Sequence, residues 1–168
     1  MTKVVFLDID GVINTDRQCE RCYEKGIVPD ERFGYPFDPE AVACLARIID
    51  KTGADIVISS SWKFWGLPDM TNMWKDRNMP GKIIDVTPNT MSDEMLLNAD
   101  LTNMDMMAFK GSEIKGWLTK HRKSVERYAI IDDVDDMLPE QQDCFVQINP
   151  ITGISEKDAE KVIAILNR

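Results

Sequence analysis

The sequence predicts an α/β fold, a Rossmann-like three-layer sandwich with a five-stranded, mostly parallel sheet. The first observation is a set of five short apolar runs, most of them without alternation, which is typical of strands covered on both faces. The second is that stretches with helical spacing of apolar residues lie between the runs, as right-handed crossovers require. The five expected strands are Val4–Ile9, Asp55–Ser59, Lys82–Val86, Tyr128–Ile131 and Phe145–Ile148.

Helix start and stop signals separate these strands. Asp38 stands before a proline, the pattern of a cap with proline at the first helical position, and Gly53 ends that helix. A weaker helical pattern lies near Met70–Arg77. Ser112 is expected to cap the next helix, and Ser155–Asp158 resembles the capping box that begins the last one.

The whole chain, residues 1–168, is expected to form a single domain. Two polar segments, at about 14–37 and 89–109, interrupt the alternation of strands and helices. Each is too short for a core of its own, so we interpret both as insertions and expect no large cap domain. The second is rich in methionine, which makes Met91–Met107 a candidate docking surface.

Composition excludes several classes of function. No run of eighteen apolar residues exists, and the N-terminus lacks the pattern of a signal peptide, so we expect a cytoplasmic protein without a membrane partner. The net charge of −9 argues against stable, sequence-independent binding of nucleic acid. A phosphorylated polymer end remains a possible substrate, because a bound divalent cation reverses the local field.

The four cysteines are expected to be free thiols in a reducing compartment. Cys19 and Cys22 have the spacing of half a zinc site, but a closed site needs four ligands. No second close pair exists, and the single histidine, His121, is distant in sequence. We therefore interpret Cys19 and Cys22 as loop thiols.

Polar side chains follow three of the predicted strands, and the carboxyl ends of parallel strands meet at one edge of the sheet. Four carboxylates at such an edge favour a hard cation, and oxygen ligands suit magnesium. Asp135 and Asp136 extend the acidic run and are interpreted as solvated or helix-starting residues, with Asp136 also a candidate for a supporting contact around such a site. The residues expected at this edge are Asp8, Asp10, Ser59, Ser60, Ser61, Asp132 and Asp133, with Lys110 opening the helix before the fourth strand.

This arrangement resembles the phosphatase branch of the haloacid dehalogenase superfamily. The resemblance rests on four motifs in order, namely Val4–Gly11, Ile56–Ser59, Lys110 at a helix start and Ala129–Asp133. Smaller details are similar to the haloacid-dehalogenase-type domains found alone or beside RNA-repair enzymes. These details are Phe37–Glu40, Ser60–Lys63, Asp85–Pro88 and Glu113–Leu118.

The resemblance implies a role for each residue. Asp8 would attack phosphorus and form an aspartyl-phosphate, and Asp10 would protonate the leaving oxygen and then activate water. Ser59 would donate a hydrogen bond to a phosphoryl oxygen, and Lys110 would neutralise charge on Asp8 and the transferring group. The implied magnesium ligands are Asp8, the Asp10 carbonyl, Asp132 and Asp133.

Four points stay open at the level of the sequence. Ser60 or Ser61 could take the role of Ser59, and Lys63, close to the serines, is a rival for Lys110. Ser60 and Lys63 are accordingly candidates for substrate binding. The substrate is expected to be a phosphate ester, either a small molecule or a nucleic-acid end. The competing function is a catalytically silent module that binds magnesium and phosphate or acts in protein interaction.

Overall fold

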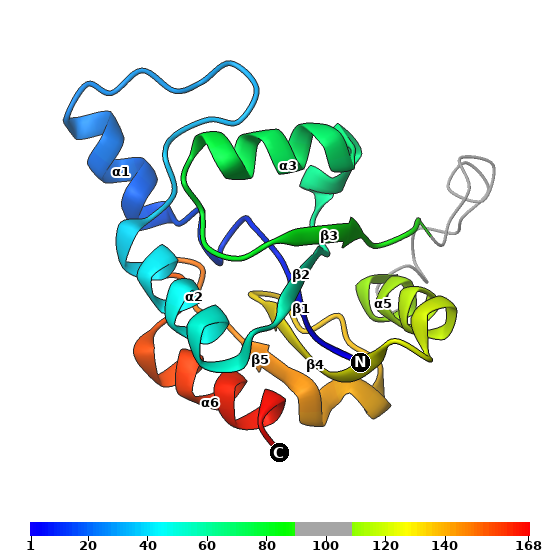
Figure 1. Cartoon of the computed structure of the whole chain (residues 1–168). Helices are drawn as coiled ribbons and strands as arrows, with labels where there is room; N and C mark the ends of the chain where they lie inside the picture. Colours follow the sequence, from blue (N-terminus) through cyan, green and yellow to red (C-terminus); the bar gives the residue numbers. More distant parts are fainter. Residues whose placement is uncertain (90–108) are drawn as a thin grey trace, which may run out of the picture.

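A computed structural model of the chain describes residues 1–89 and 109–168. The predicted sheet is confirmed, and all of its pairings are parallel, with the strand order β3-β2-β1-β4-β5 (Figure 1). The central strand β1 therefore has a neighbour on each side, which places its carboxyl end in the middle of the sheet edge. The strands are β1 (Thr2–Leu7), β2 (Asp55–Ile58), β3 (Ile83–Val86), β4 (Val125–Asp132) and β5 (Phe145–Gln147).

Both faces of the sheet are covered, which explains the apolar runs without alternation. Val5 and Leu7 of β1 belong to the larger core cluster, and Val4 and Phe6 belong to a second cluster on the opposite face. All four side chains are fully buried. Successive residues of a strand point to opposite faces, so a strand with helices on both sides requires apolar residues at every position.

Helices form the two outer layers. Apolar residues of α2, α3 and α6 pack in the larger cluster, and those of α5 pack in the second one. The 3-10 turn η1 follows β2, and the 3-10 turn η3 precedes β5. The helical elements are α1 (Asp16–Glu24), α2 (Pro39–Thr52), η1 (Ser61–Trp65), α3 (Leu67–Asp76), α5 (Phe109–His121), η3 (Pro139–Cys144) and α6 (Glu156–Leu166).

Two of the predicted helix caps are confirmed and one is wrong. The Asp38 side chain accepts a hydrogen bond from the backbone N–H of Glu40, and Gly53 ends α2 in the left-handed conformation. Ser155 begins α6 with both bonds of a capping box. Ser112 does not cap a helix, because it lies within α5. Asp136, far along the chain, instead accepts from the backbone near the start of that helix.

The segment at 14–37 is more ordered than its polar composition suggested. It contains α1, and both Cys19 and Cys22 lie in this helix. The interpretation that these thiols belong to a loop is therefore wrong. All four cysteines are free, as expected. The proposed docking surface at Met91–Met107 lies outside the described residues.

The described part of the chain contains no large cap domain beside the sheet. Of the helices in residues 1–89 and 109–168, none is both long enough and apolar enough to cross a membrane.

Candidate active site

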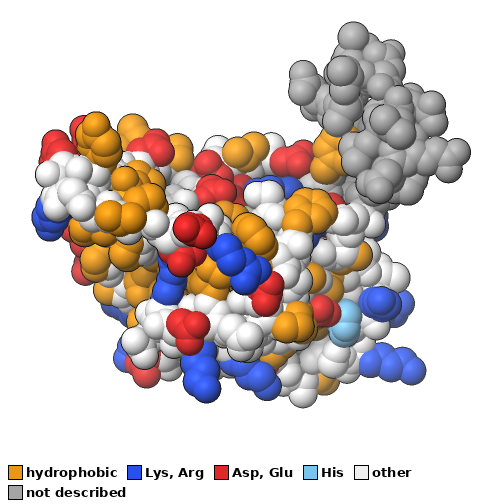
Figure 2. Space-filling model, turned by 90° about the horizontal axis from the view of Figure 1, so that it is seen from above, with side chains coloured by type: hydrophobic (Ala, Val, Ile, Leu, Met, Phe, Trp, Pro, Cys, Tyr) orange, Lys and Arg blue, Asp and Glu red, His pale blue; other side chains and the backbone are white. Residues whose placement is uncertain are grey.

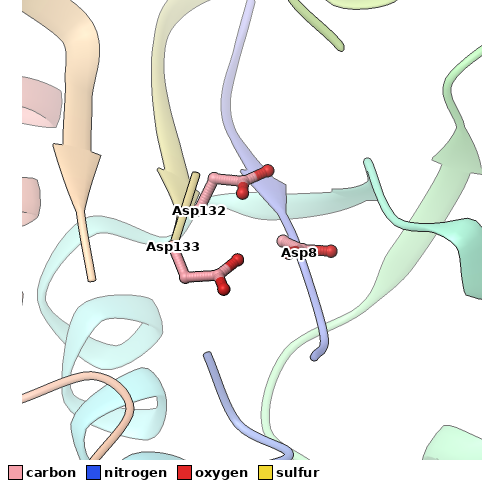
Figure 3. Close-up of side chains that lie close together, drawn as sticks. All are labelled: Asp8, Asp132 and Asp133. Carbon is pink, nitrogen blue, oxygen red and sulfur yellow. The ribbon is translucent and has the colours of Figure 1, made fainter. Parts of the chain in front are cut away.

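Three carboxylates meet where β1 and β4 end. Asp8 directly follows β1, and Asp132 and Asp133 stand at the end of β4. The two strands are paired in register at Leu7 and Ile131, and the Asp8 backbone N–H donates to the Ile131 carbonyl over 3.0 Å. As a result, carboxylate oxygens of all three aspartates lie within 4.8 Å of one another (Figure 3).

Burial makes the negative charge of this carboxylate cluster unfavourable. Asp8 is 5% exposed and Asp132 is 1% exposed. Burial and the neighbouring Asp132 carboxylate raise the pKa of Asp8 to about 7, although Lys110 acts in the opposite direction. Burial also raises the pKa of Asp132. A divalent cation among these oxygens would offset this cost, so the donor set suits magnesium.

Lys110 supplies the one ammonium group that touches these carboxylates among the described residues. Its Nζ lies 2.6 Å from Asp132 Oδ2 and 3.2 Å from Asp8 Oδ2. Burial alone would lower the pKa of Lys110, but attraction to the two aspartates outweighs burial and raises it. The ammonium group therefore stays charged beside the Asp8 carboxylate.

The start of α5 is held in position from the loop after β4. The Lys110 backbone N–H donates to Asp136 Oδ2 over 3.0 Å, and Gln141 Nε2 donates to the Gly111 carbonyl over 2.8 Å. Asp136 thus has a supporting contact, as its sequence position suggested. The buried Gln141 was missed, because nothing in its sequence neighbourhood distinguishes it from a surface glutamine.

Lys63, the rival of Lys110, is occupied elsewhere. Its Nζ lies 2.6 Å from Glu113 Oε2 and 3.4 Å from Thr87 Oγ1, and its side chain is almost fully buried. The ion pair between Lys63 and Glu113 joins η1 to α5. The structure therefore brings Lys110, and not Lys63, into hydrogen-bonding distance of Asp8 among the contacts of the described residues.

The three serines after β2 have different surroundings. Ser59 is 3% exposed, and its Oγ is the single buried side-chain polar atom without a hydrogen-bond partner in the described part of the chain. Ser60 Oγ accepts from the Trp62 backbone N–H over 3.3 Å and caps η1. Ser61 is exposed at the first position of that turn. Of the two buried serines, Ser59 is thus the one whose hydroxyl has no partner among the described residues.

Asp10 is exposed, and each of its two carboxylate oxygens accepts a hydrogen bond. Asn14 Nδ2 donates to Oδ1 over 2.7 Å, and Trp62 Nε1 donates to Oδ2 over 3.0 Å. Sequence reasoning missed both donors as partners of Asp10. The available signal was position, since Trp62 follows the serines at the same sheet edge.

Gly11 belongs to the loop after β1 and lies against the side chain of Asp133. Its φ of +77° belongs to the left-handed region, and a Cβ at this position would overlap the carboxylate of Asp133. The absence of a side chain at Gly11 therefore leaves room for the Asp133 carboxylate.

Comparison with known families matches residues 4–159 to the HAD domain in Swiss Army Knife RNA repair proteins. The chain belongs to this family. The match covers nearly the whole chain, including every residue of the site. No curated protein and no solved structure matches the chain. The family supports a HAD fold of the phosphatase type, in agreement with the all-parallel sheet and the acidic cluster of Asp8, Asp132 and Asp133.

Proposed function

We propose that this HAD-family chain is a magnesium-dependent phosphomonoester hydrolase that works through an aspartyl-phosphate on Asp8. One observation carries the proposal. Asp8 is buried at the carboxyl end of the central strand, beside two further carboxylates and one lysine. A purely structural aspartate would gain from Lys110 but not from two further carboxylates, whereas a nucleophile that must meet a phosphate needs ligands for a cation and positive charge beside it.

The donor set fits magnesium. Asp8, Asp132 and Asp133 offer oxygen ligands within a few ångströms of one another, and the backbone carbonyl of Asp10 is the fourth candidate. Bound magnesium would neutralise these carboxylates and polarise the phosphoryl oxygens of the substrate.

The protein's own residues divide the chemistry between them. Asp8 attacks phosphorus, and the bond to the leaving oxygen breaks as Asp10 gives that oxygen a proton. Asp10, now a carboxylate, takes a proton from the water that attacks phosphorus in the second step. This step releases phosphate and restores Asp8.

The free hydroxyl of Ser59 suits a donor to a phosphoryl oxygen, because a buried hydroxyl without a partner is costly in the absence of a ligand. Lys110 suits the neutralising role through its contacts with Asp8 and Asp132. We assign Lys63 to holding η1 against α5, since Glu113 already neutralises its charge. Ser60 Oγ accepts from the turn that it caps, which favours Ser59 for the phosphoryl contact.

We further propose that the substrate carries a terminal phosphate, on a nucleotide or at a nucleic-acid end. The description of the family, which refers to RNA repair proteins, supports this substrate class. A net charge of −9 disfavours extended contact with the phosphate backbone of a nucleic acid, and therefore favours transient binding of its end. On the face seen from above, acidic and basic side chains of the described residues are interspersed (Figure 2).

We also propose a cytoplasmic location. The four cysteines are free thiols, which is typical of proteins in the reducing cytoplasm.

A substrate panel tests this function. The purified chain is assayed with a sugar phosphate, a mononucleotide, 5′- and 3′-phosphorylated oligonucleotides and a phosphopeptide, each with magnesium and with EDTA. We expect magnesium-dependent release of phosphate, fastest from nucleotides or oligonucleotide ends, and none from Asp8→Asn. A chain that binds magnesium and phosphate but turns over none of these substrates would be the silent module instead.

A further inference from the structure

The acid/base Asp10 stands at an exposed position, where a side chain that is not held would sample several rotamers. Instead, both of its oxygens accept hydrogen bonds, from Asn14 Nδ2 over 2.7 Å and from Trp62 Nε1 over 3.0 Å. Each oxygen keeps a second lone pair, so the carboxyl group can still carry and release a proton. The two donors, one to each oxygen, fix the orientation of the carboxyl group.

Trp62 is itself fixed by the segment that precedes α2. Its indole ring stacks on Phe33 with centroids 5.8 Å apart and packs at an angle against Phe37 at 5.7 Å. Its backbone N–H is held by Ser60 Oγ. The ring therefore has packed neighbours on the side of residues 33–37, and among the described residues its one hydrogen-bond partner is Asp10.

Arg77 fastens this segment to the C-terminal end of α3. Its guanidinium donates to the backbone carbonyls of Phe33 and Tyr35 over 2.9 and 3.0 Å, and it lies 4.4 Å from the centre of the Phe37 ring. Figure 1 shows the chain after α1 returning beside α3 before it enters α2. A continuous set of contacts thus runs from α3 through residues 33–37 and Trp62 to Asp10.

We propose that Trp62 is a positioning residue that aims Asp10 at the leaving oxygen, and that residues 33–37 of the first insertion hold Trp62 in place. In this way a short insertion supports the acid/base residue in a chain whose described part has no large cap domain. The inference rests on the proposed phosphohydrolase function. It adds to that function the group that orients the proton donor.

The first test uses Trp62→Phe, which keeps a ring against Phe33 and Phe37 but removes the N–H donor. Values of kcat/KM are compared for p-nitrophenyl phosphate and for an alkyl phosphate, since kcat/KM reports the step in which the leaving group departs. The alkyl alkoxide needs a proton, whereas p-nitrophenolate leaves readily without one. We expect Trp62→Phe to lower kcat/KM for the alkyl ester about tenfold more than for the p-nitrophenyl ester.

The matched control is Trp65→Phe, in the same turn and also packed on Phe33, at a centroid distance of 5.4 Å. It should leave the ratio of the two kcat/KM values unchanged. Equal losses on both esters in Trp62→Phe would mean that the residue acts only in stability, and would overturn the proposal while leaving the phosphohydrolase function intact.

A second test reads the contact without turnover. The chain has four tryptophans, and their indole N–H groups give separate NMR signals, of which the Trp62 signal is identified by its loss in Trp62→Phe. Asp10→Ala should shift this signal and leave that of Trp74, which donates to the Pro80 carbonyl, in place. An unmoved Trp62 signal would contradict the inference even if the wild-type chain hydrolysed no phosphate ester.

Discussion

Ser59 and Ser60 are adjacent, equally buried and chemically identical, yet their hydroxyl groups differ in what they contact. Ser59→Ala removes a hydroxyl with no partner among the described residues, so the free energy of unfolding should stay constant or rise. In contrast, kcat/KM should fall about 100-fold, as for the loss of one donor to a developing charge.

Ser60→Ala is the control, and the opposite result is expected. Loss of the cap on η1 should cost about 1 kcal/mol of stability, with a smaller change in kcat/KM than Ser59→Ala causes. Urea unfolding and steady-state kinetics on both variants check the pair of outcomes. A Ser59→Ala chain that keeps its full activity would remove Ser59 from the site.

Gly11 and Gly26 allow the effect of a close approach to be separated from that of backbone conformation. Both have positive φ, +77° and +67°, but a Cβ at Gly26 has open space, whereas one at Gly11 overlaps Asp133. Gly26→Ala should cost about 1 kcal/mol of stability from the backbone alone. Gly11→Ala should cost more and should also weaken magnesium binding, measured by calorimetry. Equal magnesium affinity in the two variants would contradict the assigned place of Asp133.

The positions of Asp8, Asp132 and Asp133 could be predicted because the carboxyl ends of parallel strands meet, and the apolar runs mark those ends in the sequence. Trp62 was not predictable as a donor to Asp10. The direction of its N–H depends on the packing of its ring against Phe33 and on a segment that the sequence left without assigned structure.

At the scale of elements, Asp38 joins the start of α2 to the start of α1. Its buried carboxylate accepts from Thr15 Oγ1 over 2.7 Å, from Arg17 Nη2 over 2.8 Å and from the Glu40 backbone N–H. Burial would raise the pKa of Asp38, but the hydrogen bonds from Thr15, Arg17 and Glu40 together outweigh it and lower the pKa below its ordinary 3.8.

Because the folded-state pKa of Asp38 is lowered, its contribution to stability is present above pH 3.8 and is lost as the pH falls through the folded-state pKa. Asp38→Asn should therefore lower the free energy of unfolding by about 2 kcal/mol near neutral pH. The gap between the variant and the wild type should narrow under acid conditions. Urea unfolding across pH measures it, and a gap that widens in acid would refute the argument.

The helices show where local signals suffice and where they do not. Asp38, Gly53 and Ser155 act through their own neighbours in sequence, so the α2 and α6 boundaries followed from short motifs. Near the start of α5 the bond to the backbone comes from Asp136, which is 26 residues away, so Ser112 was a misleading cap. The helix α1 was missed because its polar composition hides the cap at Thr15.

At the scale of the whole molecule, the site is expected to lower the stability of the metal-free fold. In the chain without metal, Asp8, Asp132 and Asp133 are balanced by Lys110 alone among the contacts of the described residues. Magnesium should therefore stabilise the fold, by about 2.7 kcal/mol at a concentration 100 times its Kd. The melting temperature with magnesium and with EDTA measures this gain.

Asp132→Asn should lose most of the magnesium-dependent rise in melting temperature. Asp135→Asn, at an exposed aspartate that accepts from Gln142, should keep it. An equal rise in both variants would mean that magnesium binds elsewhere.

The covalent intermediate on Asp8 is the central claim, and trapping that intermediate tests it most directly. The chain is mixed with magnesium and a phosphomonoester that it hydrolyses, quenched in acid and reduced with borohydride, which converts an aspartyl-phosphate to homoserine. Mass spectrometry of the peptide that contains residues 4–11 should then find homoserine at position 8, and none when EDTA replaces magnesium. Unmodified aspartate at position 8 during turnover, together with comparable hydrolysis by Asp8→Asn, would contradict the account.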